Sequence, residues 1–204
     1  MKMFVAAAFG CLMLMSSCQL FKSKKLPVID APVIAENGDT IYPGYAQFNL
    51  LNQDSIIISE KLVKGKVSVA DFFFCSCPSI CPRMKTQMLR IYEKYKQNES
   101  VKLLSFSIDP QRDSVQRLKI YSQKLGVPDS RTWHFLTGNK ELVYQMAERL
   151  MIYASPDEDA PGGYAHNGKF VLIDGKGKIR GYYEGTDEKS VTQLLADMDV
   201  LLQE

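Results

Sequence analysis

The most informative segment of the chain is a strand-like run that ends at cysteines and prolines, Val67-Ser68-Val69-Ala70-Asp71-Phe72-Phe73-Phe74-Cys75-Ser76-Cys77-Pro78-Ser79-Ile80-Cys81-Pro82-Arg83-Met84. Its first half is rich in β-branched and aromatic residues, which favour a strand. After the prolines, apolar residues recur at three- and four-residue steps, which predicts a helix: Met84, Met88, Leu89, Ile91, Tyr92 and Tyr95. The cysteines are therefore predicted to lie at a strand-to-helix turn.

Such a turn favours reactive thiols. The first backbone N–H groups of a helix have no partner within it, and this end carries roughly half a positive charge. Both effects stabilise a thiolate and lower its pKa. Cys77 and Cys81 are four residues apart, so in a helical turn their Cβ atoms lie roughly 5–6 Å apart. At that separation the pair can bind one metal ion or form a disulfide.

The first residues have the pattern of an export signal. Lys2 supplies the positive charge, an apolar run follows, and two serines precede Cys18. Met15-Ser16-Ser17-Cys18 resembles a bacterial lipobox, which predicts cleavage before Cys18 and lipidation of that cysteine. An uncleaved anchor is the alternative. In either case the folded part faces an oxidising compartment outside the cytoplasm.

We therefore expect a lipoprotein signal peptide at residues 1–17, a lipid-anchored tether at 18–42 and one folded domain at 43–204. The predicted location is the bacterial cell envelope, with the chain anchored to a membrane through its lipid. The chain has 46% hydrophobic and 24% charged residues, which is typical of a globular protein. Its formal net charge is only +2, with no dense basic stripe beyond residues 22–25, so the composition gives no support to nucleic-acid binding.

The remaining cysteines are crowded. Of the five, Cys11 leaves with the signal and Cys18 would carry the lipid. Cys75, Cys77 and Cys81 stay in the domain, an odd number within seven residues. A stabilising disulfide is expected to close a longer loop than this, so the crowding indicates chemistry and not a structural framework.

Four segments, in this order along the chain, resemble one known family: Phe72-Phe73-Phe74-Cys75-Ser76-Cys77-Pro78-Ser79-Ile80-Cys81-Pro82-Arg83-Met84, Ser107-Ile108-Asp109-Pro110-Gln111-Arg112-Asp113, Trp133-His134-Phe135-Leu136-Thr137-Gly138, and His166 ahead of Phe170-Val171-Leu172-Ile173-Asp174. The family is Sco/SenC, thioredoxin-fold proteins that bind copper and help to assemble cytochrome c oxidase. The resemblance covers roughly residues 45–203.

The predicted elements agree with that fold. A hairpin at residues 45–58 precedes the central strand, and later segments are expected as a strand at 101–108, a helix at 114–125, a strand at 133–136, a helix at 140–151, a hairpin at 169–184 and a helix at 189–202. We expect an α/β protein with a thioredoxin-like fold, in which helices flank a central mixed sheet and an N-terminal β-hairpin forms an extension.

The resemblance assigns copper ligation to Cys77, Cys81 and His166. Thiolates and imidazole are the ligands that select the soft Cu(I) ion. The implied function is a copper metallochaperone, not an enzyme, whose partner is the copper-accepting subunit of a respiratory oxidase. Spacing alone could not have selected His166. Here Asn167-Gly168 departs from the family, which more often has a small hydroxyl residue at this point.

A second function stays open. As a thiol–disulfide oxidoreductase, the chain would use Cys77 and Cys81 as a redox-active pair that keeps the copper-binding cysteines of the oxidase reduced. Reductases of this fold more often space their cysteines as C-x-x-C, so the C-x-x-x-C spacing favours copper. A peroxidase-like relative fits the pattern less well.

Other candidate side chains have simpler explanations. We expect His134 to be structural, and Met84 and Met88 to pack in the core. Asp113 or Ser114 is expected to cap the helix that follows. We expect Asp113 to serve the turn and the helix cap rather than the chemistry, as Asp109-Pro110 is a good turn starter. Cys75, where the family usually has a non-cysteine polar residue, is expected to pack or to play an auxiliary redox part.

Overall fold

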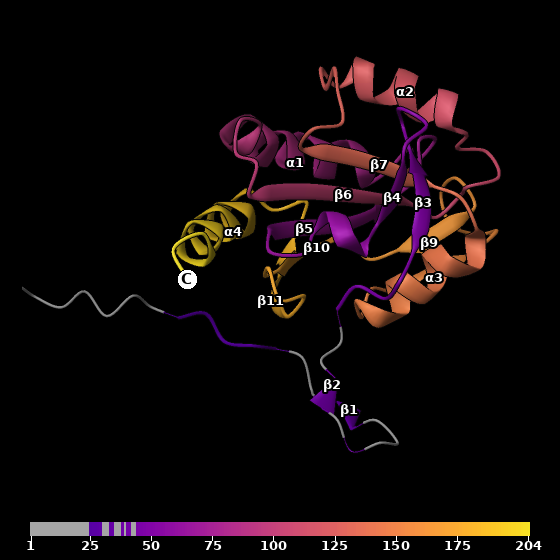
Figure 1. The fold of residues 1–204 in the computed structure, drawn as a ribbon. Helices are drawn as coiled ribbons and strands as arrows, with labels where there is room; N and C mark the ends of the chain where they lie inside the picture. The colour runs from indigo at the N-terminus through magenta and orange to yellow at the C-terminus, as the bar shows by residue number, and fades with distance from the viewer. Residues whose placement is uncertain (1–24, 30–32, 35–37, 39, 42–43) are drawn as a thin grey trace, which may run out of the picture.

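The computed structural model describes residues 25–29, 33–34, 38, 40–41 and 44–204 (Figure 1). The predicted signal peptide, the predicted lipidation site Cys18 and most of the predicted tether lie outside these residues. Within the described part of the chain, no helix has the length and apolar character needed to cross a membrane.

A seven-stranded mixed sheet forms the centre of the domain. Its strands are β3 (Asn49–Asn52), β4 (Ile57–Ser59), β5 (Val67–Phe73), β6 (Val101–Ser107), β7 (Trp133–Thr137), β10 (Lys169–Ile173) and β11 (Ile179–Glu184). The strand order is β11-β10-β5-β6-β7-β3-β4. β5, β6 and β7 are parallel, and the other neighbouring strands pair antiparallel. All residues of β5, β6 and β7 are buried, as expected for parallel strands covered on both faces.

Four α-helices connect or follow these strands: α1 (Cys81–Tyr95), α2 (Val115–Lys124), α3 (Lys140–Arg149) and α4 (Glu188–Leu201). A short 3-10 helix, η1 (Glu60–Leu62), lies between β4 and β5. Pro82 lies in the first turn of α1, where its missing N–H costs no hydrogen bond. Asn139 and Asp187 cap α3 and α4 with side-chain oxygens, as the sequence pattern favours.

The helices lie on both faces of the sheet. Phe73 of β5 faces α1 and α2, because its ring contacts Lys85 of α1 and Tyr121 of α2. Its neighbour Phe72 points to the other face and stacks on Phe106. In Figure 1, α1 and α2 lie towards the top of the view and α3 towards the lower right. The prediction of a thioredoxin-like α/β fold with a mixed sheet flanked by helices is therefore confirmed.

The N-terminal hairpin is also confirmed, with shorter strands than the sequence pattern indicates. Residues 45–48 stay outside β3 because Tyr45 and Phe48 pack their rings on Phe106. The hairpin β3–β4 then pairs with β7 and extends the sheet at one edge.

Two small hairpins lie outside the main sheet and were not predicted. One joins β1 (Val33–Ile34) to β2 (Thr40–Ile41), and the other joins β8 (Ala154–Pro156) to β9 (Tyr164–His166). β8 and β9 are three residues each, too short for a period-2 pattern to appear in the sequence. Residues 157–163, which include three acidic side chains, form the turn between β8 and β9.

Of the two residues that the sequence offers as the cap of α2, the structure selects the second. Ser114, not Asp113, caps α2, since its side chain accepts a hydrogen bond from the Arg117 N–H. Asp113 is buried instead, and its carboxylate accepts hydrogen bonds from the Cys75 N–H at 2.9 Å and the Ser107 hydroxyl at 2.7 Å. A buried carboxylate needs such donors, and here they fix the chain at the cysteine turn.

Candidate metal centre

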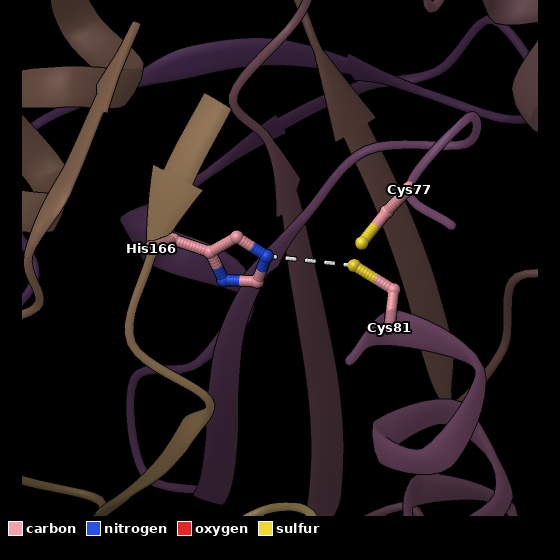
Figure 2. A group of neighbouring side chains, drawn as sticks. All are labelled: Cys77, Cys81 and His166. Atoms are coloured by element: carbon pink, nitrogen blue, oxygen red, sulfur yellow. Dashed lines mark hydrogen bonds between the residues drawn. The ribbon is translucent and has the colours of Figure 1, made fainter. Parts of the chain in front are cut away.

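Cys77, Cys81 and His166 come together at the carboxyl end of β5. Cys77 lies in the turn after the strand, Cys81 is the first residue of α1, and His166 is the last residue of β9. Their possible ligand atoms all lie within 4.8 Å of one another. In Figure 2 the imidazole enters from the hairpin side, and both sulfurs point towards it. The Cys81 Sγ and His166 Nε2 atoms are 3.5 Å apart.

The two sulfurs are set deeper than the imidazole. Cys77 is 8% exposed and Cys81 is 2% exposed, whereas His166 is only partly buried. The cysteines belong to the central core, and the histidine closes the group from the outside. The two buried cysteines would bind an ion from the core side, and a second molecule could approach it from the side of His166.

A neighbouring carbonyl group contacts one nitrogen of the imidazole. The His166 Nδ1 atom is 3.2 Å from the backbone oxygen of Asn167. A carbonyl oxygen can only accept, so this contact is a hydrogen bond when Nδ1 carries a proton. This is the arrangement in which a histidine binds a metal through Nε2 while its other nitrogen is held by a hydrogen bond.

The two thiols have opposite pKa shifts. A hydrogen bond from Cys81 lowers the pKa of Cys77 to about 3, against the opposing effect of burial, and His166 and the backbone N–H groups of Cys81 and Ser79 lower it further. The same hydrogen bond with Cys77, together with burial, raises the pKa of Cys81 above its ordinary value. Without metal, the pair therefore holds one proton on Cys81 and one thiolate on Cys77, which is ready to act as a ligand or a nucleophile.

The hairpin that carries His166 is held by contacts from the loop before α2. Arg112 forms an ion pair with Asp109 and donates a hydrogen bond to the Gly162 oxygen at 3.0 Å. Tyr164 donates a hydrogen bond from its hydroxyl to the Asp109 carboxylate, also at 3.0 Å. The two hydrogen bonds join β8–β9 to the Asp109–Asp113 segment, and the ion pair lies within that segment and holds the Arg112 side chain.

Phe74 adds an apolar contact to the same hairpin. Its ring centroid is 5.3 Å from that of Tyr164 and 6.2 Å from that of His166. Gly162 has a φ of +86°, and a Cβ at this position would lie 2.7 Å from the Phe74 ring, so only glycine fits here. The hairpin tip therefore packs closely on the chain that leads to Cys77.

The other candidate side chains are placed as expected. Met84 and Met88 are fully buried in the core. His134 is buried in β7 beside Asn52, whose amide nitrogen is 3.3 Å from its Nδ1 atom, and burial lowers the pKa of His134 to about 4. Cys75 packs against the core outside the three-ligand group, and burial together with the Asp113 carboxylate raises the pKa of its thiol. An auxiliary redox part for Cys75 stays a prediction.

Sequence analysis missed a buried ion pair near the site. Asp71 of β5 and Lys85 of α1 are 0% and 1% exposed at their side chains, with 2.6 Å between Lys85 Nζ and Asp71 Oδ2. A signal was present, because Asp71 interrupts an apolar strand and Lys85 falls four residues after Cys81 on the apolar face of its helix.

Comparison with known proteins decides the family. The SCO1/SenC family model matches residues 41–203. The chain belongs to the SCO1/SenC family. The structure is similar to that of a SCO1/SenC family lipoprotein from Bacillus anthracis, with a TM-score of 0.71, 30% identity and coverage of 84% of this chain and 97% of that one.

Two further SCO1/SenC structures are similar. BsSco, described as a member of the Sco family of cytochrome c oxidase assembly proteins, has a TM-score of 0.67 and 28% identity, with coverage of 78% of this chain and 92% of that one. Arabidopsis thaliana ScoI, solved with copper bound, has a TM-score of 0.64 and 25% identity, with coverage of 79% of this chain and 99% of that one.

Proposed function

We propose that this SCO1/SenC protein is a copper metallochaperone. It binds Cu(I) through Cys77, Cys81 and His166 and delivers it to the copper centre of a respiratory cytochrome oxidase. The observation that carries the proposal is the convergence of two thiols and one imidazole within 4.8 Å, from segments far apart in the sequence. The copper-bound ScoI structure and the description of BsSco as an oxidase assembly protein support the choice of metal and recipient.

The donor set fits Cu(I) as cargo. Soft thiolates and imidazole favour this ion over hard cations. Cys77 is already a thiolate in the metal-free pair, and Cys81 gives up its proton when the ion arrives. His166 offers Nε2, because Nδ1 is held by the Asn167 carbonyl. Three donors leave one side of the ion open, so a ligand of the recipient can attach before the chaperone releases it.

Anchoring and location belong to the same proposal. Residues 1–17 would be removed, Cys18 would carry the lipid, residues 18–42 would form the tether and residues 43–204 the working domain. The bacterial cell envelope is then the place where the protein meets the copper-accepting subunit. The B. anthracis relative, which is named a lipoprotein, supports this arrangement.

The low pKa of Cys77 favours a second candidate, a thiol–disulfide oxidoreductase. A thiolate at Cys77 can attack a disulfide of the oxidase subunit and form a mixed disulfide. This first attack breaks the S–S bond of the subunit and releases one of its cysteines as a thiolate. Cys81 then loses its proton, attacks the Cys77 sulfur of the mixed disulfide and releases the second subunit cysteine, which leaves Cys77 and Cys81 joined as a disulfide. In this function His166 has no direct part.

An anaerobic Cu(I) competition titration of the reduced full chain in detergent tests the proposal. We expect the His166→Ala variant to bind Cu(I) about a hundredfold more weakly, which corresponds to ~2.8 kcal/mol. The Cys77→Ala, Cys81→Ala double variant is the reference for a lost site. If the unaltered chain binds no more tightly than this double variant, the chaperone function is wrong. If copper affinity tolerates His166→Ala while the chain reduces an oxidase-derived disulfide peptide, the reductase function takes its place.

A further inference from the structure

A fully buried polar network joins α1, the helix that begins at Cys81, to the three parallel strands of the sheet. Lys85 Nζ donates to Asp71 Oδ2 at 2.6 Å and to the Ser105 hydroxyl oxygen at 3.0 Å. Ser105 in turn donates to Asp71, and the Trp133 indole N–H donates to Ser105 at 2.9 Å. All four side chains are buried, and they belong to α1, β5, β6 and β7.

Aromatic rings surround the ammonium group and exclude water. Lys85 Nζ lies 4.2 Å from the centroid of Phe73, 5.6 Å from that of Trp133 and 5.8 Å from that of Phe135. Removing a charged pair from water is costly, and apolar side chains of similar size often give an equal or greater stability. The pair is therefore poorly explained by stability alone.

The position of Lys85 relates it to the copper ligands. Lys85 follows Cys81 by one helical turn, so the two side chains share a face of α1 with Cβ atoms roughly 5–6 Å apart. The positive charge of Lys85 acts on the Cys81 thiol and opposes the rise of its pKa that Cys77 and burial cause.

We propose that Lys85 compensates the negative charge of the two thiolates when they hold Cu(I), and that Asp71 keeps the ammonium in place; this inference rests on the proposed function. Two thiolates, one neutral imidazole and one Cu(I) ion carry a net charge of minus one. The site is largely closed to water around the sulfurs, so a fixed cation one helical turn away stabilises this anionic complex more than solvent can.

Two single variants with opposite expected effects test the proposal. Lys85→Met removes the cation and leaves Asp71, so the dissociation constant for Cu(I) should rise about tenfold. Asp71→Asn leaves the cation without its counter-charge, so the dissociation constant should fall. If Lys85 and Asp71 only held the structure together, both variants should bind Cu(I) more weakly, because each breaks the same network. A change of the same sign in both, or no change, overturns the proposal.

The matched control is Lys94→Met. Lys94 lies on the same helix and pairs with Asp199, but both side chains are about half-exposed. It should leave the affinity for Cu(I) unchanged. If a single variant does not fold, the double variant Lys85→Met, Asp71→Asn gives the answer, since it removes both charges at once. Lys85 shares the helix face of Cys81, so the loss of its charge should outweigh the loss of Asp71. The dissociation constant should therefore still rise, by about threefold, and an unchanged value contradicts the proposal.

A measurement without copper separates this inference from the proposed function. In a glutathione redox buffer, the Cys77–Cys81 disulfide takes two electrons and two protons from two glutathione thiols, giving the dithiol and glutathione disulfide. Because Lys85 stabilises the thiolate of the reduced pair, Lys85→Met should lower the dithiol-to-disulfide ratio and Asp71→Asn should raise it. The two opposite changes in this ratio are expected even if the unaltered chain fails to bind Cu(I). A change of the same sign in both variants would overturn the role of Lys85 and leave the proposed copper function untouched.

Discussion

The β5–α1 turn and the β8–β9 hairpin supply the same site in different ways. Cys77 and Cys81 belong to a turn between a fully buried strand and a helix of the core. His166 belongs to a hairpin outside the main sheet that pairs only within itself. The first region is fixed by the core, and the second by Arg112, Tyr164 and Phe74. The site therefore combines two sulfurs that the core holds in place with an imidazole whose position depends on a few contacts of its hairpin.

The largest effect is expected within the firm region. Cys81→Ser should weaken Cu(I) binding about a thousandfold, or ~4 kcal/mol, because a soft thiolate is replaced by a poor ligand. Cys75→Ser is the matched control, since Cys75 lies two residues from Cys77 but outside the three-ligand group. It should change the affinity little. Similar losses in both variants, measured by competition titration, would show that the geometry selects the wrong cysteines.

His134 and His166 are expected to affect the stability of the folded chain differently when the pH falls. Burial lowers the pKa of His134 to about 4 from an ordinary value of 6.5, so protons bind first to the unfolded chain. The neutral His134 side chain therefore contributes its full stabilisation of the folded state above pH 6.5, and this contribution is lost as the pH falls towards 4. Between pH 7.5 and 4.5 this residue should account for a loss of about 2.5 kcal/mol in the free energy of unfolding.

Urea unfolding of the unaltered chain and a His134→Gln variant at both pH values measures that loss. The variant should lose less stability on acidification, by about the stated amount. A His166→Gln variant serves as the control, because its side chain is only partly buried on the hairpin. Equal acid sensitivity in all three proteins would contradict the assignment.

The thiols of the turn should react at different rates. At pH 5.5, Cys77 is a thiolate, whereas burial and Asp113 keep Cys75 protonated by raising its pKa. Iodoacetamide should therefore modify Cys77 at least about tenfold faster than Cys75, despite the lower nucleophilicity of a low-pKa thiolate. Peptide mass spectrometry of the reduced, metal-free chain identifies the modified residue. Faster modification of Cys75 would reverse the assigned order of the two pKa values.

The smallest effect is expected from loosening the hairpin. Arg112→Ala removes the hydrogen bond to the Gly162 oxygen that holds the tip of β8–β9, which is worth about 1 kcal/mol, together with the Asp109 ion pair that orients Arg112. Cu(I) affinity should fall severalfold, and the amides of β8 and β9 should exchange hydrogen faster while those of β5 stay protected. Arg131→Ala is the control, because Arg131 pairs with Asp129 at an exposed position away from the hairpin. Unchanged exchange in β8–β9 would show that Arg112 does not hold it.

Much of this molecule could be predicted from local patterns. The run from Val67 to Phe74 is apolar enough to identify a buried strand, and the recurrence from Met84 to Tyr95 identifies the helix after it. Asp113 could not be assigned in the same way. A carboxylate before a helix looks like a cap in the sequence, and only packing shows that its oxygen is taken by the Cys75 N–H.

By itself, the sequence determined the order of strands and helices and the placement of two cysteines at a helix start, because both depend on interactions between residues close in the chain. The tertiary structure decided what these elements enclose. It brought the His166 imidazole to the sulfurs across 85 residues, formed a hairpin from segments too short to show a period, and paired Lys85 with Asp71 in the core. Such contacts depend on how whole faces pack: the sequence marks Asp71 and Lys85 as charges among apolar residues, but only packing shows that they meet.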